Sequence, residues 1–281
     1  MKSKLTRIAA LVAALLVLTS CGGKTPDYEK SENTRAFTDS AGRTVYVPEE
    51  ITRVAVSGPM AQIVVFSAAP DKLVALAGDW SEDAGQYIDE KYYNLPILGQ
   101  LFGGTKALNM EQLAKAAPQV VIDVGESKED IAEELDSMQE QVGIPFVHIS
   151  ASLETMDETY RQIGELLNVQ DYAGTLGDYC RRVYDRTVEI MEQVGDDKVT
   201  ALYCMGDLGC NVICTGTYHS QVLDLVTENL AKSDSPSSKG TGNEVDIEQI
   251  YLWNPEVICG RKPRCTTLLT MSAPSAARPR K

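Results

Sequence analysis

Two segments of the chain repeat one arrangement of a glutamate and a proline. Residues 108–122 hold Glu111 seven positions before a proline, and residues 245–258 hold Glu248 seven positions before another. Each copy has the pattern of a short helix leading into a buried strand, so related lobes would carry the carboxylates at equivalent points. Two carboxylates at a fixed separation can dock on a basic partner in one register. Alternatively, both are ordinary solvated glutamates near helix N-termini, where the helix dipole favours acidic residues.

The residue types that enzymes and metal sites use are sparse. None of the motifs G-x-S-x-G, G-x-x-x-x-G-K-[ST], H-E-x-x-H or G-x-G-x-x-G occurs. The chain has only two histidines, His148 and His219, so a His-rich zinc or manganese site is not expected. We therefore expect a protein that is not an enzyme and that has no cofactor of its own.

Six of the seven cysteines follow residue 100, and they form no C-x-x-C pair and match no zinc motif. Cys204 and Cys214 lie in apolar, strand-like segments, which favours buried structural thiols. A disulfide among Cys204, Cys210 and Cys214 is the alternative, because disulfides form outside the cytoplasm.

The N-terminus has the order of a bacterial export signal. Three basic residues precede an apolar run at residues 8–18 that is too short to span a bilayer. Residues 18–21, Leu-Thr-Ser-Cys, then resemble a lipobox, in which the cysteine is lipidated and becomes the new N-terminus. We expect a signal peptide at 1–20, a lipid on Cys21 and a tether at 21–35. The protein would be extracytoplasmic and anchored to the cell membrane; an ordinary signal peptide with a chance cysteine is the alternative.

Charge is distributed unevenly along the chain. Residues 21–260 contain 17 of the 26 basic residues and all 40 acidic ones, a net charge of −23. Such a surface repels phosphate backbones, so we expect no nucleic-acid partner. Residues 261–281 carry six basic residues and no acidic one, and no strand or helix pattern continues there. We expect this atypical basic tail to be the out-of-frame end of a truncated product; a natural disordered tail is the alternative.

Strand and helix patterns alternate along residues 36–168, which predicts a lobe with a mostly parallel sheet and helices on both faces. A hairpin is expected at its start. The expected elements are the hairpin at 36–47, strands at 53–57, 72–77, 119–124 and 145–149, and helices from Pro59 through residue 66, at 110–116 and at 128–142.

Residues 171–194 carry apolar side chains three or four apart and predict a helix of roughly 36 Å. This interlobe helix, assigned to residues 169–195, would lead to a partial second lobe at 196–260. The fold class is therefore α/β, with two Rossmann-like lobes joined by a single long helix and the second lobe incomplete. In the second lobe we expect strands at 199–205, 211–215 and 256–259 and helices at 220–230 and 246–252.

Together these features resemble the substrate-binding lipoproteins of iron-siderophore, haem and vitamin B12 ABC importers, the class III periplasmic-binding-protein family. The resemblance covers residues 36–258. It rests on the lipobox, residues 39–48, the strand that ends at Gly58-Pro59, the long helix and the two Glu-Gln units. It implies two lobes around a cleft, with one glutamate per lobe that pairs with arginines of the permease. Glu111 and Glu248 occupy those positions.

Ligands of open α/β sheets bind beyond the carboxyl ends of the strands. Trp80, Phe102 and Tyr218 could stack on a planar ligand there, and each could equally be a packing residue. Tyr218 or Tyr87 could contact a ferric chelate. The expected ligand contacts are Pro59, Met60, Ala61, Trp80, Tyr87, Gln100, Phe102, Gly125, Met205, Tyr218 and His219.

The resemblance implies capture of an iron complex, first of all a ferric siderophore, and its delivery by a monomer to an ABC transporter permease. Haem is an alternative cargo, for which Met60 and His219 would face each other across the cleft as axial ligands. A lone histidine before a helix is more often a cap or a surface residue. Cobalamin is a further alternative. An exported α/β enzyme or sensor is the alternative from a different class.

Overall fold

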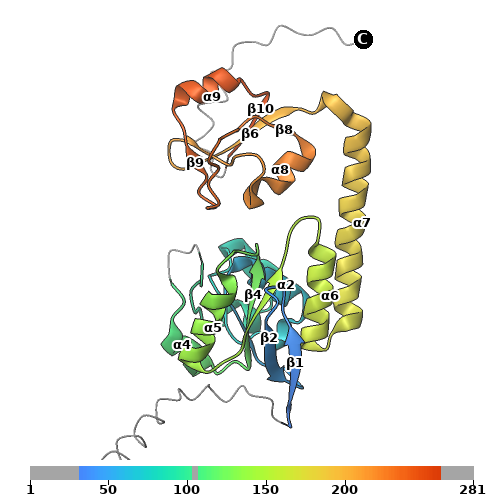
Figure 1. The fold of residues 1–281 in the computed structure, drawn as a ribbon, viewed down its shortest axis with the longest axis vertical. Coiled ribbons are helices and arrows are strands. Elements are labelled where there is room, and N and C mark those ends of the chain that lie inside the picture. The colour runs from blue at the N-terminus through green and yellow to red at the C-terminus, as the bar shows by residue number, and fades with distance from the viewer. Residues whose placement is uncertain (1–31, 103–106, 261–281) are drawn as a thin grey trace, which may run out of the picture.

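Two α/β lobes are joined along one side by a single long helix (Figure 1). The computed structural model describes residues 32–102 and 107–260. The first lobe runs from β1 to α6 and the second from β6 to β10, with α7 (Gln170–Val194) between them. This arrangement confirms the α/β fold class with one linking helix. The signal peptide, Cys21 and the basic tail 261–281 lie outside the described residues.

A β-hairpin, β1 (Thr34–Thr38) and β2 (Thr44–Pro48), begins the first lobe as predicted. Its turn is held by Asp39, whose carboxylate accepts the backbone N–H of Arg43 at 3.0 Å. The Arg43 guanidinium donates to the same carboxylate at 2.7 Å and to the carbonyl of Phe146 at 2.6 Å. A nearly buried ion pair therefore fixes the hairpin to the central sheet.

The central sheet of the first lobe has three parallel strands in the order β3-β4-β5. They are β3 (Val54–Val56), β4 (Val120–Gly125) and β5 (Phe146–Ser150), each within one or two residues of its predicted bounds. Helices cover both faces of this sheet, which explains why the strand sequences are almost continuously apolar.

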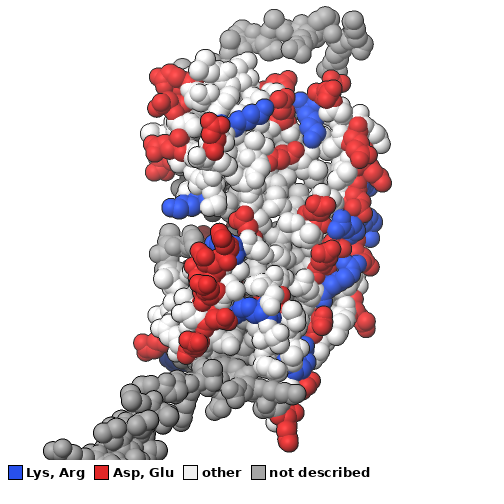
Figure 2. All heavy atoms as spheres, in the orientation of Figure 1, with Lys and Arg blue, Asp and Glu red and all other residues white. Residues whose placement is uncertain are grey.

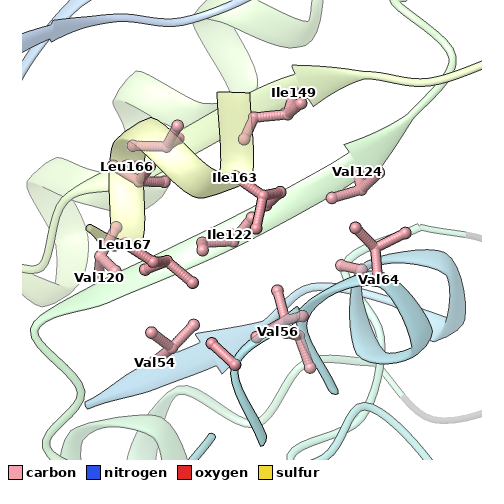
Figure 3. Close-up of a cluster of buried hydrophobic side chains, with 14 of the residues drawn as sticks. Val54, Val56, Val64, Val120, Ile122, Val124, Ile149, Ile163, Leu166 and Leu167 are labelled. Carbon is pink, nitrogen blue, oxygen red and sulfur yellow. The ribbon is translucent and has the colours of Figure 1, made fainter. Parts of the chain in front are cut away.

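One face of the sheet is covered by α2 (Pro59–Ala68) and α6 (Met156–Leu167). Val64 of α2 and Ile163 and Leu166 of α6 lie against alternate valines and isoleucines of the strands (Figure 3). All three side chains are almost completely buried. Burial of such a side chain stabilises the fold by about 1.5–3 kcal/mol, so this cluster is the main core of the lobe.

The other face is covered by α4 (Met110–Ala116) and α5 (Ile131–Val142). Leu113 of α4 and Leu135 of α5 are fully buried there beside Phe146. Both helices were predicted, α4 with its observed bounds, and the first three residues assigned to α5 belong to the loop before it.

The expected strand at 72–77 is wrong. This segment is extended, but it pairs with β3 only through Leu73 and with Ile97 only through Leu76. It changes partner between these two points, so no continuous ladder forms. Short helical turns complete the connection to α4: η1 (Pro70–Lys72), η2 (Glu82–Gln86) and α3 (Glu90–Tyr93).

Helix α6 was not predicted, and it lies tightly against the start of α7. Gly177 of α7 approaches the backbone of Asp157 on α6, because a Cβ built on Gly177 would stand 2.9 Å from the Asp157 carbonyl oxygen. The Asp157 carboxylate also bonds Arg161 at 2.8 Å and Arg181 at 2.7 Å. Burial acts to raise the pKa of Asp157, but Arg181 and Arg161 outweigh it and hold that pKa below its ordinary value. These contacts fix the linking helix to the first lobe.

The second lobe is built on a mixed sheet in the order β10-β6-β7-β9, with β8 also paired to β6. Its core includes Leu202, Val212 and Ile250. The helix expected at 220–230 is shorter, because residues 228–229 leave it to pair with β6. The elements are η3 (Gly195–Asp197), β6 (Thr200–Met205), β7 (Asn211–Val212), η4 (Tyr218–Ser220), α8 (Gln221–Val226), β8 (Glu228–Asn229), β9 (Asn243–Glu244), α9 (Ile247–Trp253) and β10 (Val257–Gly260).

Cys204 and Cys214 are buried in this core, and neither they nor Cys210 form a disulfide, which favours structural thiols. Burial raises the pKa of the Cys214 thiol. Within residues 32–102 and 107–260, no helix is both long enough and apolar enough to cross a bilayer.

The contact between α6 and α7 can be tested with two glycines of the same helix. We expect Gly177→Ala to lower the free energy of unfolding by about 1–3 kcal/mol, because the added methyl group meets the Asp157 backbone. Gly174 has open space at its Cβ position, so Gly174→Ala should be neutral or stabilise by about 0.5–1 kcal/mol. Urea unfolding followed by circular dichroism measures both. Equal effects of the two substitutions would contradict close packing of the helices.

Candidate ligand cleft and docking surface

The repeated sequence units have the same local structure in both lobes. Helices α4 and α9 end in non-glycine residues of left-handed conformation, Ala117 and Asn254, each with φ of 45°. A proline follows each of them, and the strand after each helix is parallel to an earlier strand of the main sheet of its lobe, β4 to β3 and β10 to β6. The repeat read from the sequence is therefore present as one structural unit per lobe.

A further pair of contacts is equivalent in the two units. Gln119 accepts the backbone N–H of Arg53 at 3.0 Å, and Glu256 accepts that of Thr200 at 3.0 Å. Gln119 and Glu256 each follow the proline of their unit. In both lobes the same hydrogen bond, from a backbone N–H to a side-chain oxygen, thus joins the two neighbouring strands at their amino ends. We call it the side-chain clasp.

Glu111 and Glu248 lie in the first turns of α4 and α9, and both are exposed. Figure 1 places α4 and α9 on the side of the molecule away from α7, one in each lobe. On the face shown in Figure 2 acidic side chains occupy the margins of both lobes. The surface is indented between the lobes on the side away from α7. Each lobe therefore presents an acidic helix start on the side of the molecule away from α7.

The carboxyl ends of β3, β4 and β5 meet at the edge of the sheet that faces the second lobe. Tyr218 of η4 comes from the second lobe and is half-buried. Burial raises the pKa of Tyr218, and so do the negative charges of Glu126 and Asp123 in the first lobe. Tyr218 therefore lies across the gap from the end of β4. A direct bond also joins the lobes, because Leu153 donates its N–H to Gln221 Oε1 at 2.6 Å.

The first-lobe residues expected in the cleft have different environments. Pro59 and Met60 are exposed at the start of α2, whereas Ala61 is buried in the core. Gly125 ends β4, and a Cβ on it would meet open space. Phe102 is half-buried, with the Lys128 ammonium 4.2 Å from its ring centroid. Gln100 is half-buried as well.

Trp80 belongs to a packed aromatic cluster. Its ring centroid lies 5.1 Å from that of Phe66, and its Nε1–H donates to the carbonyl of Tyr92 at 3.4 Å. The sequence left two roles open for Trp80, stacking on a ligand and packing in the core. These contacts favour packing. Tyr87, by contrast, is 87% exposed.

The loop that carries Tyr218 and His219 is braced by one carboxylate. Asp224 accepts the N–H of Gly216 at 2.8 Å and the hydroxyl of Ser220 at 2.6 Å, and its other oxygen accepts from Asn229 at 2.9 Å. The exposed His219 ring stands 5.5 Å from the Tyr218 ring, and a Cβ on Gly240 would lie 3.2 Å from it. Met205, at the end of β6, is half-buried.

A group of buried polar residues at the edge of the first-lobe sheet was not anticipated from the sequence. Asp123 and His148 are paired across β4 and β5, and the His148 Nδ1 lies 2.7 Å from Asp123 Oδ2. Ser57 donates its hydroxyl to Asp123 Oδ1. His148 Nε2 lies 3.2 Å from Ser127 Oγ, which is 2.5 Å from Ser150 Oγ. The signal in the sequence was a polar residue inside each of two apolar strands.

A shallow hollow of about 560 Å³ is formed on the surface of α7, away from this edge. Its lining comes from that one helix, and its charges include Arg181 and Asp178, which form ion pairs with α6. A single helix face cannot enclose a cargo, so we assign no ligand site there. The residues that line the hollow are Asp178, Arg181, Arg182, Asp185, Arg186 and Glu189.

Among the described residues no three His, Cys, Asp or Glu side chains gather as a metal site.

Two α/β lobes, a single linking helix and loops that face each other across a gap are the architecture of a two-lobed binding protein. Residues 55–274 match the family model described as "Periplasmic binding protein", and the chain belongs to that family. Proteins of this family bind solutes outside the cytoplasm for ABC importers, which confirms the expectations of a binding protein rather than an enzyme and of an extracytoplasmic site of action.

Solved structures share the fold. An ABC transporter solute binding protein from Sulfurospirillum deleyianum is 22% identical, covers 85% of this chain and 75% of its own, and has a TM-score of 0.75. The molybdate periplasmic binding protein MolA of Haemophilus influenzae is 19% identical over 83% and 76% of the two chains, with a TM-score of 0.63. The vitamin B12 binding protein BtuF of Vibrio cholerae is 16% identical over 78% and 79%, with a TM-score of 0.54. Comparison with curated protein sequences gives no match.

The bracing of the Tyr218 loop can be tested by removing its carboxylate. Asp224→Ala removes three hydrogen bonds to a charged acceptor, so we expect amide exchange at Gly216 to become about 10- to 100-fold faster. The exposed Asp234 makes a matched control, because Asp234→Ala should leave that exchange rate unchanged. The exchange rate at Gly216 is measured by NMR in both variants. An unchanged rate in Asp224→Ala would show that the loop is ordered by other contacts.

Proposed function

We propose that this protein captures an iron complex, a ferric siderophore, between its lobes and delivers it to an ABC transporter permease. The observation that supports this most directly is Tyr218, which a braced loop holds half-buried opposite the end of β4. A phenol can stack on a planar chelate or donate a hydrogen bond to its oxygens. The exposed Tyr87 supplies a second phenol on the first lobe.

Haem is the second candidate cargo. Met60 and His219 are both exposed, on opposite lobes, and thioether with imidazole is a known axial pair. A structurally similar protein is the haem binding protein HmuT, with 13% identity over 86% of this chain and a TM-score of 0.59. The siderophore remains our first choice, because His219 is held against its neighbours Tyr218 and Gly240.

Glu111 and Glu248 are proposed to dock on arginines of the permease. They are exposed at equivalent points of the two repeated units, and the linking helix fixes the distance between the lobes. Two such contacts define one orientation of the binding protein on its partner. The proposed lipid on Cys21 would keep the protein, as a monomer, near the membrane that holds the permease.

The cargo can be identified by fluorescence. Trp80 lies in the first lobe beside Phe66, so its emission should respond when a strongly absorbing chelate binds. We expect a ferric siderophore to quench it with a micromolar or tighter Kd, ahead of haem and cobalamin. Tyr218→Ala should weaken binding about tenfold or more, and the exposed Tyr172 on α7 is the control as Tyr172→Ala. If none of the three ligands binds at micromolar concentration, the proposed cargo is wrong.

Docking can be separated from cargo binding. We expect Glu111→Gln with Glu248→Gln to reduce uptake of the iron chelate by cells about tenfold, since two charge contacts with the permease are lost, while the Kd for the chelate stays unchanged. Glu133, an exposed glutamate in the first turn of α5, serves as the control as Glu133→Gln. Uptake by the double variant equal to that of the control would refute the docking role.

A further inference from the structure

Asp123, His148 and Ser57 of the first-lobe sheet are buried, so each must find its hydrogen-bond partners within the protein. His148 is fully buried, and Asp123 and Ser57 are 7% and 2% exposed. Neighbouring positions on the same face of the strands, Val121 and Phe146, are apolar core residues. The polar residues therefore follow apolar ones along each strand, with Asp123 inside β4, His148 in the middle of β5 and Ser57 just after β3.

We take the chain of hydrogen bonds to run from a carboxylate at Asp123 through a neutral His148 ring that carries its proton on Nδ1. Asp123 accepts the hydroxyl of Ser57 on one oxygen, and as a carboxylate it accepts the Nδ1–H of His148 on the other. A neutral His148 then has a lone pair on Nε2, which must accept from the Ser127 hydroxyl. With its proton directed inward, Ser127 can only accept from Ser150 and from groups beyond it.

We infer that Ser127 and Ser150 form a cargo subsite that accepts hydrogen bonds from a cationic donor, such as the ammonium group of a chelate side arm. Asp123 and His148 are positioning residues, because they orient the Ser127 hydroxyl without reaching the cargo. This inference rests on the proposed capture of a chelate between the lobes. It adds to that proposal the chemistry of one side of the cleft.

The charges around the subsite favour the same type of group. Glu126 is exposed on the loop between Gly125 and Ser127, and its charge acts on Tyr218 across the gap. Two cations of the first lobe are engaged elsewhere: Lys128 lies over the Phe102 ring, and Arg43 is paired with aspartates. Hydroxyl acceptors next to an exposed carboxylate attract a donor that carries positive charge.

The orientation of the relay can be measured on the ligand-free chain by ¹⁵N NMR of the His148 ring. We expect the neutral ring to carry its proton on Nδ1, and Ser127→Ala to move the Nε2 resonance toward that of a nitrogen without a hydrogen bond. Ser127 is exposed, so this variant should fold normally. Asp123→Asn should shift the tautomer toward Nε2–H. A wild-type ring protonated on Nε2 would overturn the assignment of Ser127 as an acceptor.

The donor preference can be measured with two probes: a ferric trihydroxamate that bears a terminal ammonium, and its N-acetylated form. We expect the wild-type chain to bind the ammonium form about tenfold more tightly, since a hydrogen bond to a charged donor is lost on acetylation. Ser127→Ala and Ser150→Ala should abolish this ratio, whereas Thr175→Ala, an exposed position on α7, should keep it.

Failure of this inference is distinguishable from failure of the proposed function. Equal binding of the two chelates by the wild-type chain overturns the donor subsite and leaves capture of an iron chelate intact. If neither chelate binds, and haem and cobalamin do not bind either, both the subsite and the proposed function are overturned. Turnover of p-nitrophenyl acetate that Ser127→Ala abolishes would also overturn the subsite, because Ser127 would then be a nucleophile activated by His148.

Discussion

The first lobe depends on one constraint: three parallel strands are buried on both faces, so each polar group they carry must find its partner inside the protein. Apolar side chains satisfy this condition along most of β4 and β5. Asp123 and His148 are tolerated in these strands because they hydrogen-bond to each other, and Ser57 donates a hydrogen bond to the other carboxylate oxygen of Asp123. An unpaired buried carboxylate would cost several kcal/mol. Buried polarity in these strands is therefore limited to one paired group, centred on Asp123 and His148.

The two lobes share a structural unit, and the linking helix sets the distance between its copies. Left-handed residues at Ala117 and Asn254 and the clasps at Gln119 and Glu256 fix how each short helix meets its strand. The orientation of an exposed glutamate relative to its own lobe is thus a local property. Its distance from the glutamate of the other lobe is a property of α7. Docking geometry and cargo geometry consequently share one determinant.

The sequence predicted best those elements whose ends carry their own signals. Helix α4 was predicted with its observed bounds because Asn109 caps its start and a proline limits its end. Helix α6 was missed because it is separated from α7 only by Asn168 and Val169, and the left-handed conformation of Asn168 replaces a glycine or proline signal. The segments at 72–77 and 228–229 were assigned wrongly because pairing with distant strands overrides local pattern.

The site was predicted less completely than the fold. Aromatic residues that pack and aromatic residues that bind have the same sequence signal, so Trp80 could not be separated from Tyr218 before its contacts with Phe66 and Tyr92 were visible. Asp123 and His148 are 25 residues apart and meet only through the register of β4 and β5. The attachment of α7 is likewise uneven: Asp157 ties its first half to α6, whereas Val183 and Ile190 farther along are about half exposed. Because only the start of α7 is tied to the first lobe in this way, a change in the angle between the lobes would bend the chain toward the second lobe rather than at α6.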